Sequence, residues 1–410
     1  MHLLRSRQFA LLFAGTAANA VGTWAALIAM WGYAAYRFDS GATDLAFLGL
    51  AWAGPSALIG PVAGVPIDRF GPRRVLLWAY AAASLVALAM ALSDTYGQLL
   101  ALAGVYGLAH SFTHPAMAAL PPRLVDDRRL VAANALLGVA DESAIIFGPL
   151  LAAGVIAVWG VGAAFVADAV TYWVAVAVLV PLRLREVPPP PRTTLRHELL
   201  DGLRIARRQP VIRFTMVLSV AVFVTWGSFF VIEPLYVREV LSEPATTLGL
   251  LQTAFGVGMV GMGLLLPRIG ERAATPRAVA LSVMLSGVAA ALYVGTDMLL
   301  FAYVGVFLWG VDVAFFSAPS RTLLQRAAPV SSHGRVLALH NTLESWSDTF
   351  TIPLAGFTAA AFGVRTTGFI AATIAVGAGL VGVLRAPDAP ASHEPPIDGA
   401  EHLPAVKQPA

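Results

Sequence analysis

Twelve apolar runs, each long enough to cross a lipid bilayer, follow one another along this chain of 410 residues. Crossing the hydrocarbon core takes about 20 apolar residues as a helix, and each segment must satisfy its own backbone hydrogen bonds there. The chain is 58% hydrophobic and 12% charged, too apolar for a water-soluble domain of this length. The pattern predicts an all-α membrane protein with twelve transmembrane helices. The predicted spans are 9–36, 45–67, 75–93, 97–120, 131–158, 161–182, 211–236, 246–267, 277–294, 298–320, 336–361 and 365–384.

Basic residues are distributed unevenly between the loops on the two sides of these spans. Of the 27 Lys and Arg, only Arg37, Arg238 and Arg365 fall in loops on the side away from the N-terminus. The cytoplasmic loops of membrane proteins carry an excess of Lys and Arg over the loops on the other side. We therefore expect a multi-pass protein of the cell membrane with both termini in the cytoplasm. Because this topology explains the basic charge, no nucleic-acid partner is expected.

The longest polar interruption, Arg183–Arg213, separates six spans from six. It contains the tetraproline Pro188–Pro191, typical of an extended spacer. The next segment, Glu198–Gln209, has an apolar side and a basic side. It predicts a helix that either lies along the inner membrane surface or is a solvated linker. The predicted domains are a six-helix bundle at 1–182, a cytoplasmic linker at 183–210, a second bundle at 211–385 and a disordered tail at 386–410.

The two halves of the chain share residues at nearly constant spacing. In the loop after the second span, Gly64, Arg69, Gly71 and Arg73 recur 199 residues later as Gly263, Arg268, Gly270 and Arg272. Two prolines of the fourth and fifth spans, Pro115 and Pro149, recur 204 residues later as Pro319 and Pro353. Two related groups of six helices joined by a linker are typical of a parallel-repeat secondary transporter. We therefore expect two pseudo-symmetric bundles.

The loop Gly64–Arg74 (GVPIDRFGPRR) resembles the signature between helices 2 and 3 of the major facilitator superfamily. The resemblance covers residues from about 5 to 385, and stretches such as Ala164–Tyr172 and Pro234–Val240 are similar to its macrolide-efflux and siderophore-exporter branch. It implies two bundles that rock about a central substrate cavity, no enzyme activity and no bound cofactor or metal. The expected partners are a small-molecule substrate, protons and the lipid bilayer, and the expected functional unit is a monomer.

The resemblance also gives the loop a role, because in the family its acid locks the inner gate while the cavity faces outward. The expected gate residues are Gly64, Asp68, Arg69, Gly71, Arg73 and Arg74. In the second copy Pro267 stands in place of Asp68, so the charge switch is expected in the first half alone. The alternative is that the arginines only fix the topology and Asp68 caps the next helix.

Ionisable groups within the apolar spans are the candidates for proton coupling, because a charge in hydrocarbon is costly and marks function. The candidates are Asp141, Glu142, Asp312, Glu344, Asp348 and His110. Glu344 and Asp348 are four residues apart and share a helix face, close to the position that the repeat gives Asp141. His110 is four residues from His114, but without an accompanying acid the pair predicts no catalytic zinc.

Structural roles are the alternatives for these groups. Asp141 and Glu142 either take part in coupling or are solvated near the cytoplasmic mouth. Glu344 and Asp348 either couple protons, are neutralised by an organic cation or pair structurally with Arg335 or His340. His110 is either a proton relay or a packing residue. For Asp168 a structural hydrogen bond and a coupling role stay open. Glu233 is expected near the outer end of the seventh span, where solvation at the interface is favoured over an extracellular gate. Asp126 and Asp127 are expected to cap the fifth helix.

Aromatic side chains recur on the spans expected to line the cavity, where apolar walls suit a bulky amphipathic ligand and ring faces can hold a cation. The candidates are Trp24, Trp31, Phe147, Trp226, Phe229, Trp309, Trp346 and Phe350. The leading function is proton-coupled efflux of hydrophobic or amphipathic small molecules by alternating access. The alternative on the same fold is an importer of a polar metabolite. The absence of a Walker A loop argues against ATP as the driver, and the absence of a His-Glu-x-x-His motif argues against an enzyme. The retained Asp68 loop argues against a transport-inactive protein.

Overall fold

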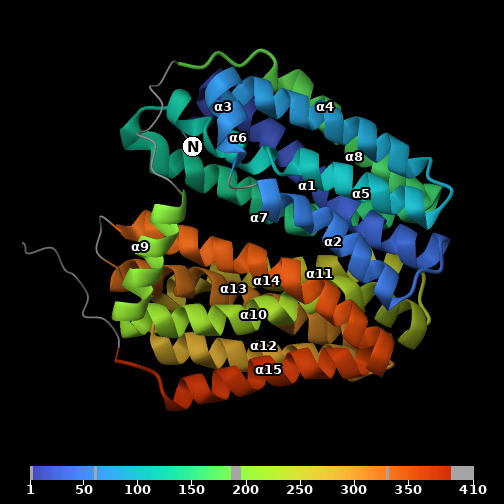
Figure 1. Ribbon diagram of the computed structural model, residues 1–410, viewed down its shortest axis with the longest axis vertical. Helices are drawn as coiled ribbons and strands as arrows, with labels where there is room; N and C mark the ends of the chain where they lie inside the picture. Colours follow the sequence, from blue (N-terminus) through green and yellow to red (C-terminus); the bar gives the residue numbers. More distant parts are fainter. Residues whose placement is uncertain (1–2, 60–61, 186–194, 329–331, 389–410) are drawn as a thin grey trace, which may run out of the picture.

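The computed structural model describes residues 3–59, 62–185, 195–328 and 332–388. Within these ranges the chain is a stack of two helical bundles, with helix α9 (Leu195–Arg208) crossing one end of the second bundle (Figure 1). We call this the α9 end and the opposite side the far end. The tetraproline Pro188–Pro191 and the tail from residue 389 onward lie outside the described residues.

Each bundle contains six long helices in chain order. The first has α1 (Arg7–Arg37), α2 (Ala42–Ile59), α4 (Pro72–Ala91), α5 (Tyr96–His110), α7 (Asp127–Trp159) and α8 (Val161–Leu179), with short turns η1 (Leu3–Arg5), α3 (Gly64–Phe70), α6 (Thr113–Ala118) and η3 (Pro121–Arg123). The second has α10 (Pro210–Leu235), α11 (Thr246–Ile269), α12 (Pro276–Val294), α13 (Leu299–Ala327), α14 (His333–Phe362) and α15 (Val364–Leu384), with the π turn η4 (Tyr236–Val240) and η5 (Gly270–Ala273).

Ten helices in the described ranges are long and apolar enough to cross a membrane. The other two spans fall short for local reasons. After 15 residues α5 ends at His110, and the span continues as α6. Polar groups such as His340 and Glu344 lower the hydropathy of α14. The predicted fold of twelve membrane helices in two six-helix bundles is confirmed, and most boundaries lie within a few residues of those expected.

The repeat is visible in the backbone as well as in the sequence. Every described residue with positive φ has a counterpart at the same turn of the other bundle, 199 or 203 residues away. These pairs are Asp39 with Ser242, Gly71 with Gly270, and Gly160 with Gly363. A left-handed turn ends α1 and the extension of α10 alike, and a glycine turn joins the last two helices of each bundle. The two bundles are therefore pseudo-symmetric down to their tight turns.

Helix α9 is packed against the second bundle, a contact that neither expectation for it included. Ala206 is buried against Met216 of α10 and Leu339 of α14. A Cβ atom at Gly202 would lie 2.9 Å from the backbone oxygen of Arg335, so glycine permits the close approach. The Asp201 carboxylate lies 3.7 Å from the Arg335 guanidinium. Since Gly202 and Ala206 of α9 pack against α14 and α10, this helix is a brace on the second bundle.

At the far end, arginines complete the C-terminal turns of helices. Arg365 donates to the backbone oxygens of Val294 at 3.1 Å and Gly295 at 2.5 Å, at the end of α12. Arg238 donates to the backbone oxygen of Ala35 in the last turn of α1. The last carbonyls of a helix lack intrahelical donors, and a guanidinium satisfies them while opposing the helix dipole.

Candidate functional site

The two bundles meet at the far end through two close helix crossings. Where α11 crosses α7, a Cβ atom at Gly249 would lie 2.6 Å from the Pro149 oxygen and 2.9 Å from Ala153 Cβ. Where α14 crosses α2, a Cβ atom at Gly356 would meet Ala46 and lie 2.6 Å from the backbone oxygen of residue 42. Small residues allow membrane helices to approach this closely. The repeat relates the two crossings, because Ala46 corresponds to Gly249 and Ala153 to Gly356.

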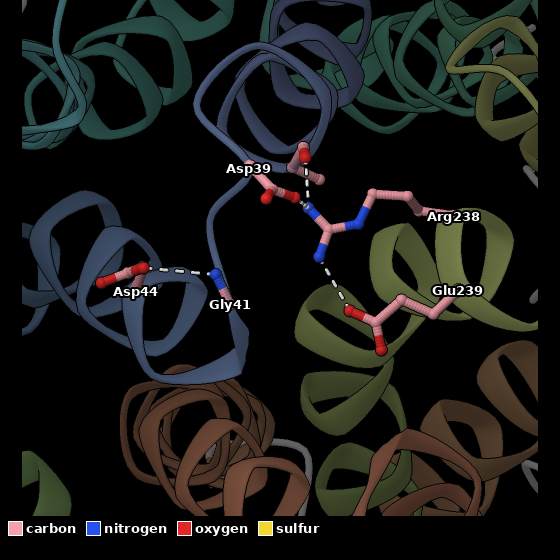
Figure 2. A network of polar contacts seen from close by, with 6 residues as sticks. Asp39, Gly41, Asp44, Arg238 and Glu239 are labelled. Atoms are coloured by element: carbon pink, nitrogen blue, oxygen red, sulfur yellow. Dashed lines mark hydrogen bonds and ion pairs between the residues drawn. The ribbon is translucent and has the colours of Figure 1, made fainter.

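A polar network ties the bundles together beside these crossings (Figure 2). Arg238, on the π turn η4, reaches from the second bundle to the loop after α1. One guanidinium nitrogen lies 3.0 Å from Asp39 and also contacts the Ala35 oxygen, and the other lies 2.7 Å from Glu239. Sequence analysis did not single out Arg238 as a site residue. The available signal was that it is one of only three basic residues in the far-side loops.

A second hydrogen bond joins the two bundles at the far end. The hydroxyl of Tyr36 donates to the backbone oxygen of Glu243 at 2.7 Å. On the first-bundle side, the backbone N–H of Gly41 donates to Asp44 at 3.2 Å, which fixes the start of α2 next to the network (Figure 2). Helix crossings and polar bonds therefore close the far end.

Between the bundles lies a cavity of about 840 Å³, lined by α1, α7, α10, α11, α13 and α14. It opens toward the α9 end. On α11, a Cβ atom at Gly263 would have no heavy atom within 4 Å, whereas Gly249 on the same helix is clamped. Val139 and Leu264, which line the cavity near that end, are 56% and 70% exposed.

Aromatic rings form much of the cavity wall. Five of the eight predicted aromatic residues line it, namely Trp24, Trp31, Trp226, Phe229 and Trp309. Phe230 and Phe255, which the sequence did not single out, line it too, and the Phe229 and Trp309 rings lie 4.4 Å apart. The remaining three are not among the lining residues and are more than half exposed: Phe147, Trp346 and Phe350.

Four charged side chains line the cavity. Three are the carboxylates of Glu142, Glu233 and Glu344, and Arg321 is the one basic lining residue among those described. Arg321, near the α9 end of α13, interacts electrostatically with both Glu142 and Glu344. Since it directly follows a predicted span, the sequence placed it in a loop and gave no sign that it faces the cavity.

The expected partners of Glu344 have other partners. Arg335 lies 3.7 Å from Asp201 of α9, and His340 Nε2 lies 3.0 Å from the hydroxyl of Ser219. The charge that acts on Glu344 belongs to Arg321 instead. The alternative of a structural pairing with Arg335 or His340 is therefore not seen for Glu344, because Arg335 contacts α9 and His340 contacts α10.

Glu233 is buried, which corrects the expectation of a solvated acid at the membrane interface. Its side chain is 7% exposed and accepts hydrogen bonds from Tyr293 at 2.7 Å and Gln252 at 2.5 Å. The physical reason is that α10 continues past the predicted end of its span as the π turn to Val240. Glu233 therefore lies deeper, where its remaining surface faces the cavity.

The other candidates for proton coupling lie at separate places in the structure. Asp312 is 6% exposed, and its Oδ2 atom has no hydrogen-bond partner among the described residues. Asp141 is exposed on α7 beside the cavity and interacts electrostatically with His114. His110 stacks on Tyr106 with ring centroids 6.4 Å apart. Asp348 lies in α14, and its side chain is outside the described part of the chain.

The signature loop forms a short helix, α3, followed by a glycine turn at Gly71 with φ of 83°. Asp68 is exposed and forms no ion pair with the residues that the structure describes. Arg69 lies over the ring of Phe70 at 5.2 Å, and Arg73 donates to the backbone oxygen of Leu182 at 2.6 Å. Gly64 and Arg74, the other expected gate residues, are also exposed.

Two capping expectations do not hold. Gly71 precedes α4 and no side chain caps that helix, so Asp68 is not its cap. At the start of α7, Asp126 makes no side-chain cap bond. It pairs instead with Arg185 at 2.8 Å, and this hydrogen bond and the guanidinium charge lower the pKa of Asp126. The connection after α8 returns Arg185 to this position, which no local sequence signal indicates.

Two six-helix bundles around a cavity that opens to one side define a membrane transporter of the alternating type. The chain belongs to the Major Facilitator Superfamily, whose family model matches residues 12–350 and 246–409. Members of the family are transporters and not enzymes, and the resemblance inferred from the signature loop is confirmed.

Relatives in sequence are distant and cover most of the chain. The chain is 22% identical over 388 residues to the uncharacterized MFS-type transporter YfiS of Bacillus subtilis (strain 168), covering 90% of this chain and 91% of that protein. It is 20% identical over 333 residues to macrolide efflux protein A of Streptococcus pyogenes, covering 78% and 82%.

Solved structures share the fold at lower identity. A crystal structure of the nucleoside transporter NupG superposes with a TM-score of 0.77 at 9% identity, covering 92% of this chain and 99% of that one. A bacterial homolog of the human lysosomal transporter Spinster, solved in an inward-facing conformation, gives a TM-score of 0.72 at 12% identity, covering 92% and 97%.

Proposed function

We propose that this protein is a proton-coupled exporter of amphipathic cations in the cell membrane, working as a monomer by alternating access. Its α9 end faces the cytoplasm, in agreement with the excess of Lys and Arg in the loops on that side. The conformation described above is then the one that is open to the cytoplasm, ready to take up cargo. The observation that carries the proposal is the cavity, with its aromatic walls and its excess of carboxylates.

The class of cargo follows from the cavity wall. A volume of about 840 Å³ accommodates a drug-sized molecule. Three carboxylates against one guanidinium leave the lining acidic, which favours a positively charged molecule. Rings such as Trp31, Trp226 and Trp309 attract a cation through their π faces and cover its apolar part. The likeness to a macrolide efflux protein supports export rather than import.

The signature loop acts as the inner gate in this proposal. With the cytoplasmic side open, Asp68 is exposed and has no ion-pair partner among the described residues. When the bundles rock and the cytoplasmic side closes, the α3 loop approaches the second bundle. Asp68 then gains polar partners there, which stabilises the outward-open form. A carboxylate that is partnered in one conformation and solvated in the other biases the balance between them.

Proton coupling rests on carboxyl groups buried within the bundles. Three such acids, Asp168, Glu233 and Asp312, are less than one-tenth exposed and are the candidates for the coupling group. A buried acid at membrane depth is stable only when it is neutral or well partnered. Gaining and losing a proton therefore changes the energy of the conformation around it, and a proton gradient can drive the cycle.

Export of a fluorescent cation tests the proposal directly. Cells that express the protein and are preloaded with ethidium should lose the dye faster than cells carrying an empty vector, and a protonophore should abolish the difference. In proteoliposomes, an imposed pH gradient should drive ethidium accumulation. Dye movement that ignores the pH gradient would refute proton coupling. If ethidium is not moved and cells instead depend on the protein for growth on a polar nutrient, the protein is an importer.

A further inference from the structure

A cluster of polar side chains lies inside the first bundle, apart from the cavity. Asp168 on α8 is fully buried, and its Oδ2 atom accepts a hydrogen bond from Tyr106 of α5 at 2.9 Å. The Tyr106 hydroxyl lies 3.0 Å from that of Tyr172, which lies 3.5 Å from Thr23 Oγ1 on α1. None of these four residues lines the cavity. The second bundle contains a separate cluster around Glu233.

The other oxygen of Asp168, Oδ1, has no hydrogen-bond partner among the described residues. Helix α1 passes so closely that a Cβ atom at Gly22 would lie 2.7 Å from it. The titratable groups that face Asp168 are Tyr106 from α5 and Tyr172 from α8. Behind Tyr172 lies Tyr80 of α4, with ring centroids 5.3 Å apart. None of these is a cation, so an ionised Asp168 would be a buried charge without a counterion, which is strongly unfavourable.

We propose that Asp168 carries the coupling proton, at a site separate from the substrate cavity. The inference rests on the proposed proton-coupled export. In the conformation open to the cytoplasm the carboxyl holds a proton, which it releases to the cytoplasm when cargo enters the cavity. It takes up another proton in the outward-open form. The exchange is one proton in for cargo out, and no covalent bond other than the carboxyl O–H changes.

A line of polar groups leads from Asp168 toward the cytoplasmic end of the first bundle. Tyr106 is bonded to Asp168 and stacks on His110, one turn further along α5. His110 Nδ1 lies 3.5 Å from the hydroxyl of Thr113, at the start of α6. Beyond it, His114 is exposed and interacts electrostatically with Asp141. The two histidines and Asp141 thus lie along a route by which a proton leaves the bundle.

Helix α1 connects the proton site to the cavity. Gly22 and Thr23 face the polar cluster, whereas the next residue, Trp24, lines the cavity together with Ile28 and Trp31. A cargo molecule that presses on the Trp24 side of α1 shifts the Gly22 side against Asp168. Proton and cargo therefore act on opposite sides of one helix and do not compete for one carboxylate.

Infrared spectroscopy tests the proton site without any cargo. Purified protein in liposomes at neutral pH should show the carbonyl stretch of a protonated carboxylic acid, and Asp168→Asn should remove a component of this band. Asp94→Asn, the same change at an exposed residue outside the spans, is the matched control and should leave the band intact. A band that survives Asp168→Asn unchanged, or that is lost only in Asp312→Asn, would overturn the assignment.

Transport measurements test the coupling role. With ethidium as the probe, Asp168→Asn should retain exchange of dye across a membrane without a pH gradient and should lose accumulation driven by one, by at least tenfold. Accumulation equal to that of the wild type would refute the role. If the wild type exchanges ethidium but never accumulates it, the proposed proton coupling fails, while the infrared result still decides where the proton lies.

Tyr106→Phe provides a second variant in case Asp168→Asn does not fold. It removes one hydroxyl from the start of the proposed route and keeps the ring stacked on His110. The carboxylic band should remain, and accumulation driven by the pH gradient should slow severalfold while gradient-free exchange is unchanged. Accumulation at the wild-type rate would exclude the route through Tyr106.

Discussion

The two ends of the molecule carry similar charged residues in opposite states of engagement. At the far end, Arg238 contacts Asp39, Glu239 and the last turn of α1, which joins the two bundles (Figure 2). At the α9 end, Asp68 is exposed and has no ion pair in the described chain, although the same loop holds Arg69 and Arg73. The charged groups at the far end therefore join the two bundles, whereas Asp68 at the α9 end does not.

This difference shows that the charged groups report the conformation. In a rocking mechanism the contacts at one end form as those at the other end break, so only one set is expected to be complete at a time. In the proposed mechanism the far-end network is a second gate, which the sequence did not indicate. The Asp68 loop, which the sequence indicated, is then the gate whose contacts this conformation lacks. Substitutions confined to one end of the molecule therefore test each set of contacts separately.

The largest effect is expected from a wedge at the far-end crossing. Gly249→Leu would place side-chain atoms where a Cβ already lies 2.6 Å from the Pro149 oxygen. Overpacking of this kind costs about 3 kcal/mol, roughly a hundredfold in the balance of conformations. Transport should therefore be almost abolished and the far end held open. Gly261→Leu on the same helix, where a Cβ meets nothing within 4 Å, is the control.

The chain contains no cysteine, so a pair of engineered cysteines carrying spin labels reports the opening of the far end directly. Spin labels at Gly41→Cys and Asp297→Cys, one in the far-end loops of each bundle, should move apart in the Gly249→Leu background. An unchanged distance together with normal transport would contradict the role of the crossing.

Asp68→Asn is expected to abolish most transport by weakening the opposite gate. The exposed side chain contributes no ion pair among described residues in this conformation, so insertion and thermal stability should be unchanged. The outward-open form should become rarer, with a loss of at least tenfold in ethidium efflux. Arg74→Gln, an exposed change in the same loop, is a comparison for the effect of charge alone. A well-expressed Asp68→Asn protein with normal efflux would exclude the gate.

Removing the guanidinium of Arg238 should make the outward-open form more frequent, the opposite of Asp68→Asn, and by a smaller factor. Arg238→Gln loses its contacts with Ala35 and Asp39, whose combined contribution is about 1–2 kcal/mol. The spin-label distance at the far end should therefore lengthen in a fraction of molecules. Arg37→Gln is the control, since Arg37 lies over Tyr33 of its own helix at 6.0 Å and does not join the bundles in the contacts described. Equal spectra for the two variants would remove Arg238 from the gate.

The smallest effect is expected at the brace formed by α9. Asp201→Asn weakens the contact of 3.7 Å with Arg335 and the one of 2.6 Å with Arg204 of the same helix, and the two arginine side chains are 48% and 62% exposed. Exposed ion pairs contribute at most about 1 kcal/mol, so the melting temperature should fall by a few degrees at most and transport should stay within twofold of the wild type. A large loss of transport would show that α9 controls the gate.

The sequence predicted the bundles well because hydrocarbon dictates the spans. Each run of apolar residues became helical, with a break in the fourth span between α5 and α6. The repeat of Gly64–Arg74 at Gly263–Arg272 matches the paired turns at Gly71 and Gly270. The burial of Glu233 was missed because a π turn extends α10 by one turn, and hydropathy does not detect that extension.

The site was predicted less completely, because helix facing depends on packing between distant segments. Trp309 and Trp346 look equivalent in sequence, yet one lines the cavity and the other is 56% exposed on the surface. Arg321 follows a predicted span and was counted with the loops, although α13 continues to Ala327 and holds it at the cavity. Contacts such as that of Arg238 with Asp39 join residues far apart in the chain, and no local sequence pattern indicates them.

The bond from Arg238 to the Ala35 oxygen spans 203 residues of sequence. During synthesis the last turn of α1 therefore waits for its donor until α10 has emerged from the ribosome and entered the membrane. On the proposed orientation, Arg238 must also be translocated to the outer side before it can bind there. The far-end seal therefore cannot form before the second bundle has begun to insert, and the first bundle made alone would leave the last carbonyls of α1 without this donor.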